Sequence, residues 1–222
     1  MTTNKIKFAL AILVNVCSIF SFLYLYAHEL SPNIADLKVE KNGVHIKFVT
    51  NLEAYLTGVD FSTRDNNKGH NNLEYYKKLR TLGETELSSV FLNNWDEFTS
   101  LLTIATEDGR KLDRFFFSFI EIEEIDNIDV PRLSTIHFFV EAFGIKSFTF
   151  KASEKLGDII LRQEGVENGV SQYLTPGEKS VIISNDKMER RTKVDIFFDY
   201  LLAGFYHILP KGIDHILFVM GL

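Results

Sequence analysis

Two histidines and an aspartate near the C-terminal end of the sequence have the types and spacing to bind a metal ion. His207 stands seven residues before Asp214, and His215 follows directly. Carboxylate oxygen and neutral imidazole together suit a borderline divalent ion such as nickel or zinc. The segment Pro210-Lys211-Gly212 breaks a helix, so the chain can fold back between the ligands. A structural role fits equally well, with His207 near a helix end and Asp214 as the N-cap of the next helix.

The elements around these residues point to a membrane. Residues 194–208 have one apolar face at helical spacing, which predicts an amphipathic helix at a membrane surface. After the break, the sequence from Ile216 to Leu222 is apolar throughout, which predicts the start of a transmembrane helix that the sequence includes only in part. An ionisable pair at the head of such a helix is costly unless it is paired, hydrated or metal-bound.

The other end of the sequence predicts export. Residues 1–27 have a basic start, an apolar stretch from Phe8 to Tyr26 and the small residue Ala27, in the order of a cleaved signal peptide. An uncleaved anchor helix is the alternative, because the apolar run approaches the length that spans a bilayer. Cys17 is the only cysteine, which excludes a disulfide framework and a cysteine-rich zinc site.

Residues 28–190 between these segments predict an exported β-rich domain of the α+β class. Alternating apolar and polar residues predict a hairpin over 35–50 with a turn at Asn42-Gly43, and further short strands follow after residue 113. Three-and-four spacing predicts two helices within 73–106. Short strands at regular intervals with one helical insertion indicate a sandwich-like fold. The further strands are expected at 113–125, 133–143, 147–152, 158–164 and 181–183.

Composition narrows the function classes. The 222-residue chain has a net charge of −6, which argues against a general nucleic-acid binder with its basic face. The domain contains no nucleotide-binding loop, nucleophile elbow or zinc-protease motif, so we expect no enzyme. His45 and His137 lie in strand patterns and His70 lies in a polar loop, which favours structural or solvated roles. The acidic cluster lacks the spacing of a calcium loop and is expected to be a solvated strand end. Its members are Glu121, Glu123, Glu124, Asp126 and Asp129.

The C-terminal segment resembles the opening of the membrane domain of the HupE/UreJ family. Residues 200–222, YLLAGFYHILPKGIDHILFVMGL, carry the closest similarity. Ala-His-Glu-Leu-Ser-Pro at 27–32 and Leu-Thr-Pro-Gly-Glu at 174–178 are similar to the family's subgroup with an exported domain. The resemblance implies hydrogenase or urease accessory functions and permeation of nickel or a related metal. It places the family's His and Asp-His motif on His207, Asp214 and His215.

Two functional hypotheses follow. The first is a protein of the cell membrane that takes up nickel or another divalent metal as its transported ion, with an exported periplasmic or extracellular domain. The second is an exported interaction module tethered to the lipid bilayer, with no transport role. Further apolar helices with histidine or acidic residues downstream would favour the first hypothesis.

Overall fold

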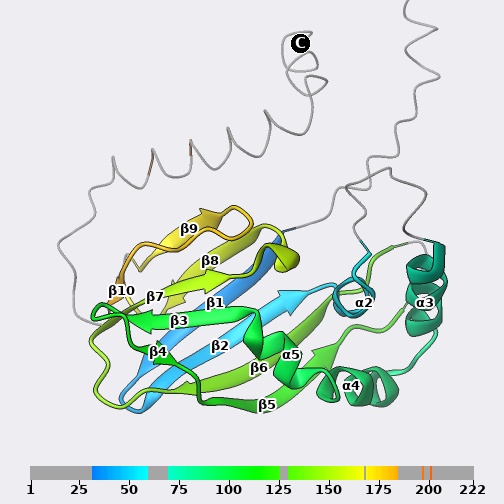
Figure 1. The fold of residues 1–222 in the computed structure, drawn as a ribbon, viewed down its shortest axis with the longest axis horizontal. Coiled ribbons are helices and arrows are strands. Elements are labelled where there is room, and N and C mark those ends of the chain that lie inside the picture. Colours follow the sequence, from blue (N-terminus) through cyan, green and yellow to red (C-terminus); the bar gives the residue numbers. More distant parts are fainter. Residues whose placement is uncertain are drawn as a thin grey trace, which may run out of the picture. The chain divides into compact units, whose positions relative to one another are not determined.

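The fold is seen in a computed structural model, which describes residues 32–59, 70–125, 130–167 and 169–184, together with residues 197 and 201. Two sheets pack face to face (Figure 1). All neighbouring strands are antiparallel except β1 and β8, which are parallel. The six-stranded sheet has the order β5 (Phe115–Ile122), β6 (Ser134–Glu141), β2 (Gly43–Thr50), β1 (Asn33–Glu40), β8 (Ile159–Glu164) and β9 (Ser171–Leu174). The four-stranded sheet has the order β10 (Ile183–Ser184), β7 (Ser147–Ala152), β3 (Leu102–Thr106) and β4 (Lys111–Leu112).

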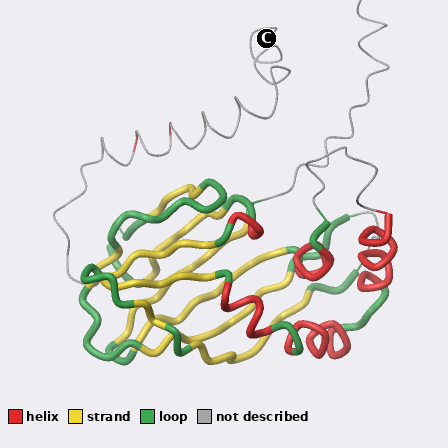
Figure 2. Tube along the Cα trace, viewed as in Figure 1, coloured by secondary structure: helices red, strands yellow, loops and turns green. Residues whose placement is uncertain are grey.

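The helices between β2 and β3 gather at one end of the sheets, and only a short 3-10 turn, η1 (Glu154–Leu156), lies elsewhere among the helices drawn (Figure 2). These helices are α2 (Leu52–Thr57), α3 (His70–Arg80), α4 (Glu84–Leu92) and α5 (Trp95–Ser100). The predicted fold, a mainly β sandwich-like α+β domain with a helical insertion, is confirmed.

The core lies between the sheets and follows the period-2 patterns of the strands. Val44, Ile46 and Phe48 of β2 are buried while His45 and Lys47 are exposed, as the alternation predicted. From the opposite sheet, the inward side chains are also buried. They include Ile104, Phe148 and Phe150. Phe98 of α5 joins the insertion to this core, with ring centroids 5.5 Å from Phe48 and 6.0 Å from Phe138.

The first hairpin forms as predicted, but its turn lies one residue earlier. Glu40 pairs with Gly43, so Lys41 and Asn42 are the turn residues. Gly43 is the first residue of β2, and its lack of a side chain has a packing cause. A Cβ there would lie 2.1 Å from the carbonyl oxygen of Val140 on β6. Close approach to the neighbouring strand therefore requires glycine at this position.

Several predicted boundaries were wrong for identifiable reasons. The helical pattern extended through Leu102, yet α5 ends at Ser100 and Leu102 begins β3, where it alternates inward with Ile104. His70 was expected to lie in a polar loop, here residues 64–72, but α3 begins at this residue. Helix α2 was not predicted, although Asn51 caps it by accepting from the backbone N–H of Ala54. The last predicted strand, 181–183, is reduced to β10, and β9 was not predicted.

A β-bulge in β5 changes the face of an aromatic side chain. Phe117 pairs with Phe138, but Phe119 pairs with His137, so one extra residue stands between the two pairs. The alternation of residues 113–125 predicted Phe119 on the same face as Phe115 and Phe117. The bulge turns Phe119 out of that row, and its side chain is 50% exposed.

Candidate binding face

The outer side of the six-stranded sheet brings together polar and aromatic side chains from strands far apart in the sequence. We call this side the outer face. Strand registers align Phe119, His137, Lys47, Asp36 and Arg162 in one row across five strands. A second row contains Phe116, Phe139, His45, Lys38 and Glu164.

A shallow hollow of about 330 Å³ lies on the outer face. Its volume is at the lower end of the range for small-ligand sites. The hollow is lined by Asp36, Lys38, His45, Ile46, Lys47, Ser118, Phe119, His137, Phe138 and Glu164. These residues come from five neighbouring strands of the sheet, β5, β6, β2, β1 and β8.

Stacked rings form one wall of the hollow. The His137 imidazole lies 4.0 Å from the Phe119 ring at an interplanar angle of 13°. His45 stands beside Phe139, with centroids 4.7 Å apart. Each imidazole also has a carboxylate nearby, at 3.4 Å from His45 to Glu40 and 3.7 Å from His137 to Glu121. His45 was expected to face solvent from its strand, and it is exposed. His137 was expected to have a structural role. Both imidazoles line the hollow.

Several charges around the hollow are already paired. Arg162 donates to both oxygens of the buried Asp36 carboxylate, at 2.6 and 2.8 Å. Lys38 contacts Glu40 at 3.0 Å. The hydrogen bond from Lys38, assisted by the charge of His45, lowers the pKa of Glu40 below its usual value.

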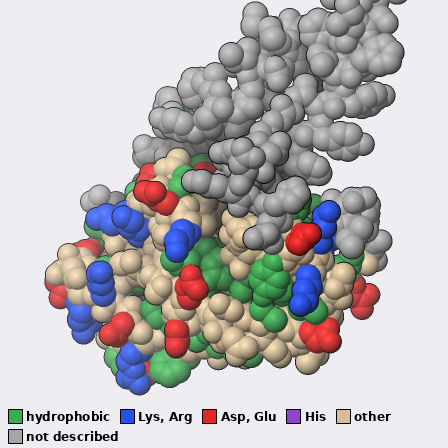
Figure 3. Space-filling view, turned by 45° about the vertical axis from the view of Figure 1, so that its right-hand side comes forward, with side chains coloured by type: hydrophobic (Ala, Val, Ile, Leu, Met, Phe, Trp, Pro, Cys, Tyr) green, Lys and Arg blue, Asp and Glu red, His purple; other side chains and the backbone are tan. Residues whose placement is uncertain are grey.

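Two charged side chains of the hollow have no such partner. Lys47 and Glu164 are exposed, line the same hollow and form no ion pair with any other described residue. Lys47 on β2 and Glu164 on β8 are thus a cation and an anion on opposite sides of β1, without an ion-pair partner among the described residues. In the view of Figure 3, acidic and basic side chains are interspersed over another part of the surface, without a large field of one sign.

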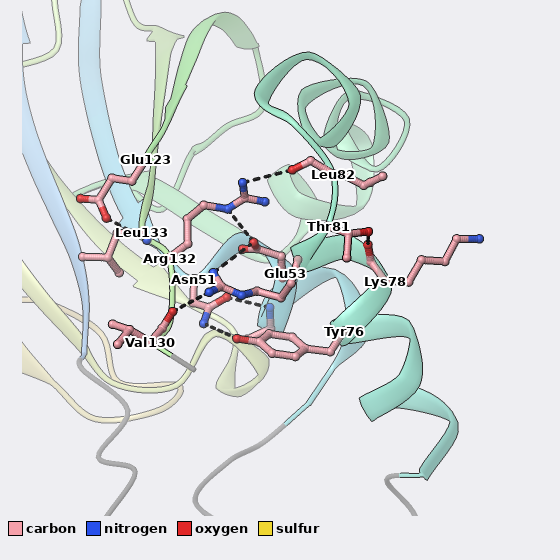
Figure 4. A network of polar contacts seen from close by, with 12 residues as sticks. Asn51, Glu53, Tyr76, Lys78, Thr81, Leu82, Glu123, Val130, Arg132 and Leu133 are labelled. Atoms are coloured by element: carbon pink, nitrogen blue, oxygen red, sulfur yellow. Dashed lines mark hydrogen bonds and ion pairs between the residues drawn. The ribbon is translucent and has the colours of Figure 1, made fainter. Parts of the chain in front are cut away.

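A second polar cluster is buried where the helices meet the sheet (Figure 4). Glu53 of α2 is fully buried and accepts from Arg132 Nε at 2.7 Å. Arg80, at the end of α3, has Nη1 3.8 Å from the same oxygen and donates from Nη2 to the carbonyl of Val130. Arg132 also donates to the carbonyl of Leu82 at 3.2 Å. The cluster is inaccessible, so we assign it the role of holding the insertion on the sheet.

The predicted metal ligands His207, Asp214 and His215 lie outside the described residues, as do the predicted signal peptide and the apolar segment after residue 215. Among the residues that are described, no three histidine, cysteine or acidic side chains are grouped as a metal site. In that part of the chain, no helix is long and apolar enough to cross a bilayer. Phe197 and Leu201, from the predicted amphipathic helix, are helical and exposed.

The predicted solvated strand end is confirmed for the residues that can be seen. Glu121, Glu123 and Glu124 are exposed, while Asp126 and Asp129 lie outside the described residues.

Neither a scan against models of known protein families nor a search of curated proteins found a match for this chain.

Proposed function

We propose that the described domain is an exported binding module, held at the cell membrane by the segment that follows it. Its ligand on the outer face is a short extended peptide that carries one acidic and one basic side chain. The observation that carries this proposal is the hollow in which Lys47 and Glu164, beside a wall of stacked rings, have no ion-pair partner within the described part of the chain.

The spacing of the two free charges suits a peptide. Lys47 and Glu164 are separated by two strand spacings and by two residues along the strands. This amounts to about 12 Å between Cα atoms at ordinary sheet spacings. Side chains that point inward from this distance can reach charges about 7 Å apart, the separation of alternate residues in an extended peptide. The rings of Phe119 and His137 offer an apolar surface to the peptide backbone.

The test is calorimetric titration of the full chain in detergent with the peptide Ac-Glu-Ala-Lys-NH2. The matched neutral peptide is Ac-Gln-Ala-Gln-NH2. We expect the charged peptide to bind more tightly, and Lys47→Gln to weaken it about tenfold, equivalent to about 1.4 kcal/mol. Lys151, an exposed lysine of the other sheet, supplies the control Lys151→Gln, which should leave binding unchanged. Equal binding of the two peptides would contradict the proposal.

A second candidate function is uptake of nickel or another divalent metal through the membrane segment. The HupE/UreJ-like motif at His207, Asp214 and His215 favours it. We expect His215→Ala to reduce nickel accumulation in cells. Because ligation needs neutral imidazole, nickel binding by the unsubstituted protein should weaken below a pH of about 6.5. Normal accumulation at wild-type protein levels would refute the ligand assignment. A decrease that tracks protein abundance would favour the capping role.

A further inference from the structure

Three turns come together at the end of the sandwich opposite the helices. The backbone N–H of Ala142 donates to the carbonyl of Asn42, and the Ser147 hydroxyl donates to Glu107 at 2.7 Å. We call this region the turn end. It consists of residues 41–42, 107–110 and 142–146, together with Ser184.

The described domain ends at this same place. Ser184 pairs with Ser147, and its hydroxyl donates to the carbonyl of Lys146 at 3.2 Å. The domain begins at the other end, where the backbone N–H of Asn33 donates to the carbonyl of Asp158. Figure 1 shows β10 and the start of β1 at opposite ends of the sandwich.

Phe143 is the most exposed large apolar side chain of the turn end, at 71%. It stands at the tip of the β6–β7 turn, beside Gly144, whose φ of 66° is in the left-handed region. The side chain belongs to no part of the core that the described residues form. One exposed phenylalanine is ordinary on a protein surface. Its place at the end where the described domain stops is what suits Phe143 to contact with a membrane interface.

The sequence after Ser184 fixes how far the turn end can be from a bilayer. Nine residues lie between Ser184 and Val194, where the predicted amphipathic helix begins, so ten Cα–Cα steps join the two. A chain of this length spans at most about 35 Å when fully extended. The turn end is therefore the end of the sandwich that the linker connects most directly to the membrane segment.

We propose that the turn end faces the lipid bilayer and that Phe143 inserts among the lipid headgroups. This inference rests on the proposed attachment of the chain to a membrane. The turn end carries three basic and two acidic side chains, which nearly balance: Lys41, Arg110, Lys146, Glu107 and Asp108. Insertion therefore depends on apolar contact and requires no anionic lipid.

The test uses the full chain with Cys17→Ser and one new cysteine for a fluorescent label, either Lys146→Cys at the turn end or Lys155→Cys in η1 at the opposite end. Both lysines are exposed. The labelled protein is reconstituted in phosphatidylcholine vesicles that contain a nitroxide-labelled lipid, and flotation with the vesicles establishes attachment. We expect severalfold stronger quenching at position 146 than at position 155. Adding Phe143→Ser should reduce quenching at position 146. Replacing about a third of the lipid by phosphatidylglycerol should leave the quenching at position 146 unchanged.

The outcomes separate this inference from the proposed attachment. A protein that fails to float refutes both. Floating protein with no quenching at 146 refutes the orientation alone. Equal quenching at both positions also refutes it, and is the result expected if residues 1–27 remain in the membrane and draw the opposite end toward it. An unchanged signal in Phe143→Ser refutes the anchoring role of Phe143.

Discussion

Replacing Glu53 with glutamine is expected to lower the free energy of unfolding by about 3–5 kcal/mol, the cost of removing one partner from a buried ion pair. Glutamine preserves the shape of the side chain but removes its charge. The guanidinium of Arg132, 2.7 Å away and buried, then faces a neutral amide. The loss should be visible in urea unfolding of the full chain, followed by the fluorescence of Trp95, the only tryptophan.

The matched control for this variant is Glu74→Gln. Glu74 also lies on a helix of the insertion but is exposed. Its replacement should change stability by no more than about 0.5 kcal/mol, as is usual for surface positions. If Glu53→Gln were as mild as this control, the buried cluster would not hold the insertion on the sheet. Hydrogen exchange should locate the loosening in α2, α3 and the segment around Arg132.

Phe98→Ala is expected to cost about 3–5 kcal/mol, the range for truncating a buried phenylalanine. Phe98 is fully buried, and its ring contacts residues of both the insertion and the six-stranded sheet. The ring centroids of Phe91 and Tyr55 lie 5.4 and 5.5 Å away, in addition to the contacts with Phe48 and Phe138. Truncating this side chain would therefore remove packing contacts between the helices and the six-stranded sheet.

Far-ultraviolet circular dichroism is the appropriate probe for Phe98→Ala, because Trp95 stacks on this ring and its fluorescence would change directly. Phe143→Ala, measured in detergent, is the control, since the Phe143 side chain is largely exposed and is not part of the buried core. A loss of stability in the control equal to that of Phe98→Ala would contradict the assignment of Phe98 to the core.

The strands with clear alternation could be predicted from the sequence because each buries one face. Val44, Ile46 and Phe48 are such a case, and their burial is as predicted. The inward row of β5 could not be predicted, because the bulge before Phe119 depends on pairing with β6. The start of β3 at Leu102 could not be predicted either. The apolar residues at 98, 101 and 102 fit the end of a helix and the start of a strand equally well.

The candidate site was less accessible to prediction than the fold. His45 and His137 were correctly placed in strands, but the hollow depends on the order β6, β2, β1, β8, which is not the order of the sequence. The buried cluster joins Glu53 and Arg132, 79 residues apart, and no local pattern marks either residue. The residues with the strongest chemical signal, His207, Asp214 and His215, lie outside the described part of the chain.

Reversing both free charges of the hollow tests the central claim most directly. The measurement is calorimetric titration of Ac-Glu-Ala-Lys-NH2 into Lys47→Glu, Glu164→Lys and the double variant. If the two side chains bind opposite ends of the peptide, each single variant should lose at least about tenfold in affinity, or 1.4 kcal/mol. The double variant should recover most of it, with the peptide bound in the opposite direction. Affinity that is unchanged in the single variants, or lost and not recovered in the double variant, would contradict recognition of a mixed-charge peptide at the outer face.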